Sequence, residues 1–251
     1  MLLDAIRSVW VYVNLLAVTI ALSSAVVVCA LLRVRGPIYD WAGLAWARWM
    51  LRVSGTRVRV IGLEHAKADR PRIFASNHQS WFDVFALAAH LPGPYRFVAK
   101  AELGRIPIFG HAWRAAGHIS VDRGDRQSAV QSLDEAAARL RRENSAVVIF
   151  PEGTRSPTGQ LLPFKKGAFI LALHSGVDII PVAVSGGRDI LGKHNWLVRR
   201  GEIVVRIGPP ILTAEYSSAT RDALIARVRS EIQRLLDLSA RAARQDGRPE
   251  P

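Results

Sequence analysis

Two short stretches of the chain carry side chains that could do chemistry together. In NHQSWFD (77–83), His78 and Asp83 lie five positions apart, directly after an apolar stretch. A neutral imidazole can take a proton from an alcohol, and a carboxylate can orient the ring and stabilise the imidazolium that forms. In PEGTRS (151–156), also after an apolar stretch, a glycine precedes a threonine and an arginine. Such a loop allows close backbone approach and offers hydrogen-bond donors to a phosphate.

The spacing of His78 and Asp83 leaves two interpretations open. In a regular helix the two side chains would point about 140° apart, so they can meet only if His78 lies in a loop and Asp83 in the first turn of the next helix. Residues 80–83 (SWFD) also fit a capping pattern in which Asp83 bonds back to the start of that helix. One carboxylate can do both. The capping and the catalytic interpretation can therefore both be true.

The sequence offers no covalent nucleophile to accompany the histidine. No GxSxG motif occurs, and the lone cysteine, Cys29, is not near His78 in the sequence. The attacking hydroxyl would then belong to the substrate, which favours direct acyl transfer over a serine-bound intermediate. The single cysteine also excludes an intramolecular disulfide framework and a multi-cysteine zinc site.

The elements that must position these residues alternate along the chain. A length of 251 residues suits one α/β domain with an appendage. The alternation predicts a mostly parallel sheet flanked by helices, with sites at the carboxyl ends of strands. We expect strands at 56–62, 72–76, 95–100, 118–122, 146–150, 178–184 and 202–208, and helices at 81–90, 126–143, 165–175 and 218–242.

The amino-terminal segment is predicted to associate with a membrane. Residues 9–32 carry no charge, and as a helix they would span about 36 Å, enough to cross a bilayer. The flanking sequence lacks a good signal-peptide cleavage site. Arg33 and Arg35 follow the segment, which places the downstream domain in the cytoplasm if the helix spans. A helical hairpin that enters one leaflet fits the sequence as well.

The next segment combines tryptophan with arginine. Trp41, Trp46 and Trp49 lie in the same segment as Arg48 and Arg52, a composition typical of a helix at a membrane interface. An amphipathic helix packed on an ordinary core would show a similar pattern. Both interpretations remain open from the sequence.

The charge of the chain indicates anionic partners. Its 34 basic residues, all but five of them arginine, exceed its 21 acidic residues and give a net charge of +13. Such a surface suits nucleic acid, phosphorylated small molecules or acidic lipid headgroups. No nucleic-acid-binding motif is present, and aromatic residues gather near the apolar amino terminus, so we do not expect nucleic acid as a partner.

Four ordered blocks resemble the glycerolipid acyltransferases, specifically the bacterial 1-acyl-glycerol-3-phosphate acyltransferases. NHQSWFD supplies the HxxxxD pair of that family, and AKAELGRIPIFGHAWRAAGHISVDR supplies the second block with Arg123. FPEGTRS forms the third block, and IIPVAVSG forms the fourth with Pro181. The resemblance covers about residues 50–210, and four ordered blocks are far more specific than HxxxxD alone.

The resemblance implies a reaction at the inner membrane, with the catalytic domain facing the cytoplasm. A fatty acyl chain would pass from acyl-CoA or acyl carrier protein to the free 2-hydroxyl of lysophosphatidic acid, giving phosphatidic acid. No metal and no cofactor beyond that co-substrate are expected. Relatives with the same blocks acylate lyso-ornithine lipid or other lysophospholipids, so the acceptor stays open. A non-catalytic lipid-binding protein is the alternative from another functional class.

These considerations predict site residues and boundaries. His78 would be the general base with Asp83 as its partner, and Glu152 would hold Arg155 or the loop in position. The expected substrate-binding residues are Asn77, Lys100, Arg123, Glu152, Gly153, Thr154 and Arg155. The expected regions are membrane-associated helices at 1–52, an acyltransferase domain at 53–243 and a flexible tail at 244–251.

Overall fold

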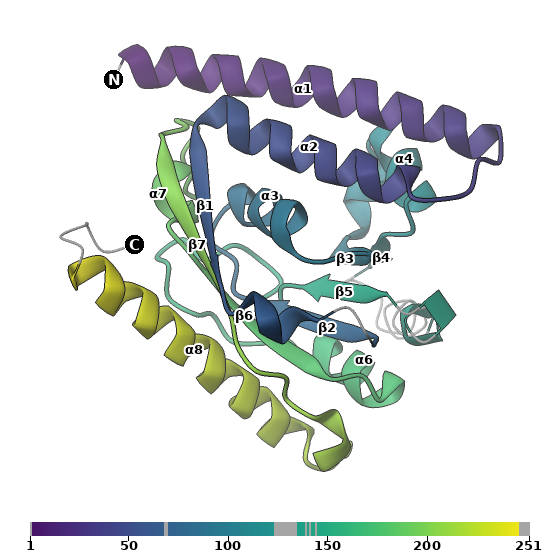
Figure 1. The fold of residues 1–251 in the computed structure, drawn as a ribbon, viewed down its shortest axis with the longest axis vertical. Coiled ribbons are helices and arrows are strands. Elements are labelled where there is room, and N and C mark those ends of the chain that lie inside the picture. The colour runs from purple at the N-terminus through teal and green to yellow at the C-terminus, as the bar shows by residue number, and fades with distance from the viewer. Residues whose placement is uncertain are drawn as a thin grey trace.

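A seven-stranded sheet forms the centre of the fold, with helices on both faces (Figure 1). The structure, a computed structural model, describes residues 2–67, 70–122, 135–138, 140, 142–143 and 145–245. Most of the helix expected at 126–143 and all but two residues of the expected tail at 244–251 lie outside this range. The strands are β1 (Thr56–Ile61), β2 (Arg72–Ser76), β3 (Tyr95–Lys100), β4 (Ile119–Val121), β5 (Ala146–Ile149), β6 (Ile179–Ser185) and β7 (Gly201–Ile207).

The helices fall on two sides of this sheet (Figure 1). In the view of the figure, α1, α2 and α3 are layered above the sheet, whereas α6 and α8 lie below it. The α-helices are α1 (Leu2–Leu31), α2 (Ile38–Ser54), α3 (Trp81–His90), α4 (Phe109–Ala115), α6 (Gly167–Ser175), α7 (Gly187–Ile190) and α8 (Arg221–Gln245). The short 3₁₀ turns in the described part of the chain are η1 (Leu63–Ala66), η2 (Ala101–Arg105) and η3 (Thr213–Glu215).

The strand order is β1-β7-β6-β2-β5-β3-β4, and every neighbouring pair is parallel except β6 with β7. The expected α/β fold with a mostly parallel sheet is confirmed. Strands β2 and β5 are direct parallel neighbours, with Ala75 opposite Ile149. Their carboxyl ends therefore meet at one edge, which brings the loop at 77–80 beside the loop at 150–156.

Two apolar cores stabilise the sheet, one on each face. Because side chains alternate along a strand, Phe74 and Val148 join the core beneath α2 and α3, whereas Ile73 and Val147 join the core over α6 and α8. All four side chains are buried. Both central strands are thus fixed from both sides, which gives the loops that follow them a rigid base.

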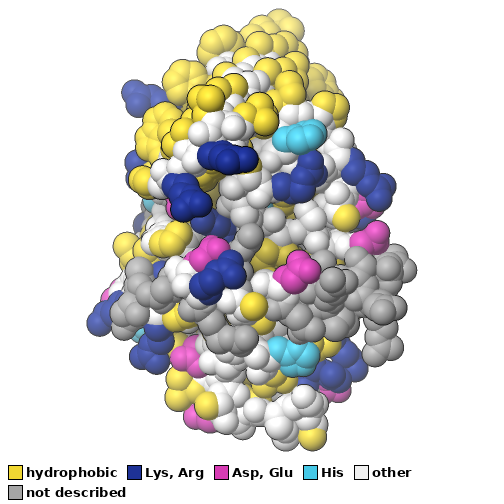
Figure 2. All heavy atoms as spheres, turned by 90° about the vertical axis from the view of Figure 1, so that its right-hand side faces the viewer, with side chains coloured by type: hydrophobic (Ala, Val, Ile, Leu, Met, Phe, Trp, Pro, Cys, Tyr) yellow, Lys and Arg dark blue, Asp and Glu magenta, His cyan; other side chains and the backbone are white. Residues whose placement is uncertain are grey.

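Helix α1 lies along α2 and also contacts α4 (Figure 1). Hydrogen bonds join the pair: Trp46 Nε1 donates to Thr19 Oγ1 at 2.9 Å, and Trp49 Nε1 donates to Asn14 Oδ1 at 3.2 Å. Helix α1 is long and apolar enough to cross a membrane. Only 17% of its apolar 18-residue stretch is buried in the protein. Seen from the side in Figure 2, apolar side chains gather at the top of the molecule, with lysine and arginine side chains beneath them.

The three tryptophans of α2 differ in their exposure. Trp46 packs edge-on against Phe85, with ring centroids 4.8 Å apart. Trp41 and Trp49 remain 56% and 45% exposed on the outer side. The helix therefore packs on the core through one face and presents tryptophan to its surroundings on another.

Candidate active site

His78 lies in the loop after β2, and Asp83 lies in the first turn of α3. His78 Nδ1 is 2.9 Å from Asp83 Oδ2. A carboxylate only accepts hydrogen bonds, so Nδ1 carries the proton and Nε2 is left as the basic nitrogen. The imidazole stacks on Phe150, with ring centroids 4.0 Å apart. The geometry is that of a base whose tautomer is set by a buried carboxylate.

The carboxylate of Asp83 caps the helix and orients the imidazole at the same time. Its Oδ2 accepts hydrogen bonds from the backbone N–H of Gln79 at 2.6 Å and of Ser80 at 2.8 Å, in addition to His78. The Ser80 hydroxyl accepts from Phe82 N, which completes the capping box. Both interpretations of the SWFD pattern therefore hold. Asp83 is fully buried, and its position is set by the start of the helix.

Gly187, at the start of α7, leaves no room beside this carboxylate. A Cβ added at Gly187 would lie far inside van der Waals contact of Asp83 Oδ1 and 3.0 Å from Ser80 Cβ. We expect Gly187→Ala to displace Asp83, to lower the unfolding free energy by about 1–3 kcal/mol and to reduce turnover, although Gly187 is proposed to touch no substrate. Thermal unfolding and turnover measured on the same samples test this. Gly192→Ala, whose added Cβ would meet only ordinary contacts, is the matched control and should behave like wild type.

Glu152 ties the two loops together. Its Oε1 accepts from the backbone N–H of His78 at 2.8 Å, and its Oε2 accepts from Leu162 N at 3.0 Å. The Ser156 N–H in turn donates to the His78 carbonyl at 2.7 Å. Of the two roles expected for Glu152, the structure shows that it holds the loop: its carboxylate bonds to backbone and not to Arg155. The imidazole and the PEGTRS loop are thereby fixed in one unit.

Burial raises the pKa of Glu152 to about 7, although its two backbone hydrogen bonds act in the opposite direction. An acid whose pKa is higher in the folded than in the unfolded protein takes up a proton on folding. The contribution of Glu152 to the unfolding free energy should therefore fall as the pH rises from about 4.5 to about 7 and then level off. Glu152→Gln does not titrate and should lack this component. Denaturant titrations of both proteins across this range test it, and parallel pH curves would contradict it.

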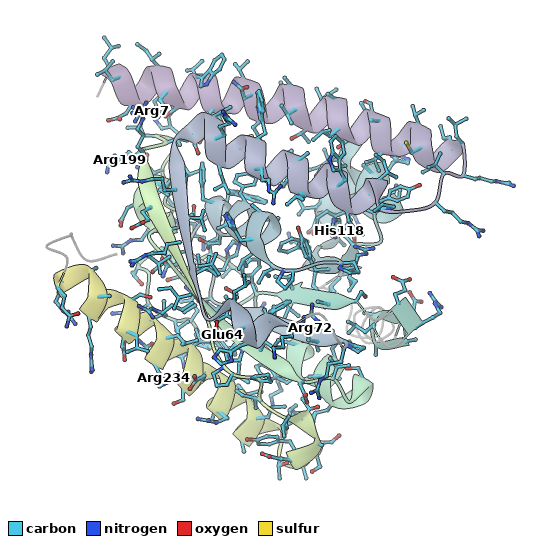
Figure 3. All side chains as sticks on the ribbon, viewed as in Figure 1. Arg7, Glu64, Arg72, His118, Arg199 and Arg234 are labelled. Carbon is cyan, nitrogen blue, oxygen red and sulfur yellow. The ribbon has the colours of Figure 1, made fainter. Side chains whose placement is uncertain are left out.

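A cavity of about 1110 Å³ opens beside the histidine. His78, Thr154 and Arg155 line it together with apolar side chains of α1, α2 and α4. His118, which also lines it, lies between α2 and the sheet (Figure 3). Burial lowers the pKa of His118 to about 3, and its Nδ1 accepts from Phe97 N, so this ring is neutral. Most of the side chains that line the cavity are apolar, which suits it to an apolar chain.

The PEGTRS loop places its donors on this cavity. Gly153 has φ +71°, a left-handed conformation that favours glycine. The Arg155 guanidinium lies 5.6 Å above the Trp81 ring, and burial lowers its pKa, although an arginine stays charged. Thr154 presents its hydroxyl at the same edge, where Lys193 Nζ donates to it at 3.2 Å. The structure thus brings His78, Thr154 and Arg155 together, as the sequence predicted.

For three other residues predicted to bind substrate, the structure shows a different situation. Lys100 lines the cavity but is ion-paired with Glu102 at 2.5 Å and is largely exposed. Asn77 bridges β2 to β6, since its amide donates to the Val184 carbonyl and accepts from Val184 N; its observed contacts position the strand ends. Arg123 lies outside the described residues. The sequence did not identify Lys193 as a site residue. Its only indication was its position a few residues after β6, one of the strands whose carboxyl ends could carry a site.

Curated relatives share this part of the chain. The 1-acyl-sn-glycerol-3-phosphate acyltransferase of Saccharomyces cerevisiae is 35% identical over 186 residues, which cover 70% of this chain and 61% of that protein. The alpha form of the same enzyme from Homo sapiens is 37% identical over 175 residues, 70% of this chain and 62% of that protein. The match thus spans about three fifths of the length of these relatives.

A solved structure and a family model also match this chain. The crystal structure of the 1-acyl-sn-glycerophosphate (LPA) acyltransferase PlsC from Thermotoga maritima has a TM-score of 0.76 to this structure, at 24% identity. The similarity covers 93% of this chain and 95% of that one, which shows a shared fold. The family model described as Acyltransferase matches residues 57–185, which include both loops of the site. This protein belongs to the acyltransferase family.

Proposed function

We propose that the protein transfers a fatty acyl chain from acyl-CoA or acyl carrier protein to the 2-hydroxyl of lysophosphatidic acid, giving phosphatidic acid. The observation that carries the proposal is that His78, whose ring bonds to the buried Asp83, and Arg155 line one largely apolar cavity. A base, an anion-binding side chain and room for an alkyl chain are the three things this acceptor requires. The names of the curated relatives support the same reaction.

The proposed reaction is a single transfer between substrates. His78 Nε2 takes the proton of the acceptor hydroxyl as its oxygen attacks the thioester carbonyl. The C–O bond forms, the C–S bond breaks, and the imidazolium returns the proton to the departing thiolate. Ser80, the serine of the first loop, donates its hydroxyl to the Leu191 carbonyl, which favours direct transfer over acylation of that side chain. No metal and no cofactor beyond the thioester donor enter this reaction.

The lipid substrates are proposed to reach the site from a membrane through the helix pair. The outer face of α1 presents large apolar side chains, which include Leu3, Ile6, Trp10, Val13 and Ile20. Its inner face packs along α2 and lines the cavity. Burial of this outer face in the cytoplasmic leaflet of the inner membrane would place the cavity at the depth of the acyl chains. The catalytic domain would then face the cytoplasm.

Thiol release tests the reaction directly. Purified protein in mixed micelles should release thiol from oleoyl-CoA when lysophosphatidic acid is present, and phosphatidic acid should accumulate. Lyso-ornithine lipid in a parallel reaction tests the alternative acceptor, and acyl carrier protein loaded with the same chain tests the donor. Lipid binding without thiol release from either donor would show that the protein is a binder, and the proposed function would be wrong.

A further inference from the structure

We propose that Lys193 is a second cation for the acceptor phosphate, acting with Arg155; this inference rests on the proposed function. Lys193 lies in the connection between α7 and β7 and lines the cavity that contains His78. Its ammonium donates to the hydroxyl of Thr154, the residue directly before Arg155. Two loops that are distant in sequence thus bring a lysine to the loop that carries the arginine.

The connection at 191–200 is held in place from two directions. On one side, the Ser80 hydroxyl donates to the Leu191 carbonyl at 2.8 Å, which fixes the connection to the start of α3. On the other, α1 holds it: Tyr12 donates its hydroxyl to the Trp196 carbonyl at 2.8 Å, and the Ser8 hydroxyl accepts from Val198 N at 2.7 Å. Lys193 therefore extends from an anchored segment, which lowers the entropy lost when it binds a ligand.

The charges on the cavity wall favour an anion at this end. Among the described residues that line the cavity, none is aspartate or glutamate. Four are lysine or arginine: Lys100, Arg155, Lys165 and Lys193. Lys100 is ion-paired with Glu102, whereas Lys193 donates to the Thr154 hydroxyl in the PEGTRS loop. A phosphate monoester carries close to two negative charges at neutral pH, so a second cation beside Arg155 matches its charge.

The test compares Lys193→Gln with wild type in acceptor affinity and donor affinity separately. Loss of one charge-assisted hydrogen bond to phosphate should raise the KM for lysophosphatidic acid, and the inhibition constant of sn-glycerol 3-phosphate, by about 10- to 100-fold. The KM for oleoyl-CoA and the slow hydrolysis of the thioester by water should stay unchanged. Lys193→Arg keeps the charge and should restore most of the acceptor affinity.

Arg199→Gln is the matched control. It removes one positive charge from the same connection, but Arg199 is exposed and lies at the outer edge of the fold, beneath the amino-terminal end of α1 (Figure 3). It should behave like wild type. An unchanged acceptor KM in Lys193→Gln, or an increase in the donor KM instead, would overturn the inference.

Calorimetric titration separates this inference from the proposed function. Titration of wild type and Lys193→Gln with lysophosphatidic acid in detergent measures acceptor binding without turnover. If wild type releases no thiol, the proposed function is wrong, and weaker binding by Lys193→Gln still supports a phosphate contact. Equal binding of lysophosphatidic acid by both proteins would contradict the role proposed for Lys193, whether or not the wild type turns over substrate.

Discussion

His78→Ala should lower the rate of acyl transfer by at least about a hundredfold, because general base catalysis contributes about 10² to 10⁴ to a rate. The ring makes few other contacts: it stacks on Phe150, and its Nδ1 bonds to Asp83. The neighbouring loop is held through the His78 backbone N–H and carbonyl, which alanine retains. The variant should therefore fold and bind lipid normally. Thiol release and phosphatidic acid formation, measured together, provide the rate.

Asp83→Asn complements this variant. An asparagine cannot accept three hydrogen bonds through one charged oxygen as Asp83 Oδ2 does, so both the ring tautomer and the helix cap should suffer. We expect a severe loss of rate with some loss of stability, whereas His78→Ala should lose rate alone. A His78→Ala protein that keeps more than about a tenth of the wild-type rate, a loss below about 1.4 kcal/mol, would rule out the general-base role.

Arg155→Ala should weaken the use of lysophosphatidic acid by about 10- to 100-fold in kcat/KM, the range for a charge-assisted hydrogen bond that is lost. Hydrolysis of the thioester by water should be nearly unaffected, because water carries no phosphate. Arg155→Lys should recover little, since a lysine cannot reproduce bidentate contacts or stacking on Trp81. The measurement is the ratio of transfer to hydrolysis with oleoyl-CoA. Equal losses in both reactions would indicate a donor-binding or structural role for Arg155.

The strands, and the position of both loops at the carboxyl edge of the sheet, could be predicted from the sequence. Apolar stretches such as 72–76 and 146–150 are buried on both faces of a parallel sheet, so they are continuous and easily recognised. Each expected strand matches an observed one to within one residue at either end. Because sites lie at the carboxyl ends of parallel strands, His78 and Arg155 were expected to share a site, and the cavity contains both.

Contacts that depend on strand order could not be predicted. Glu152 bonds to the His78 backbone because β2 and β5 are neighbours, an adjacency that no local pattern specifies. Lys193 reaches Thr154 through a connection fixed by α1 and by Ser80, and periodicity carries no information on such long-range bonds. The same limit applies to the tryptophans of α2. Which of them face the core depends on how α1 and α3 pack against that helix.

The stoichiometry of thiol release with and without acceptor tests the central claim most directly, namely that His78 activates a hydroxyl of the substrate for direct transfer. Wild-type protein is incubated with oleoyl-CoA alone and then with lysophosphatidic acid added. Thiol, phosphatidic acid and the mass of the intact protein are measured at each stage. We expect only slow hydrolysis and no acylated protein without the acceptor, and one phosphatidic acid for each thiol once it is added. A burst of thiol equal to the enzyme concentration before acceptor is added, with acylated protein in the mass spectrum, would contradict the account.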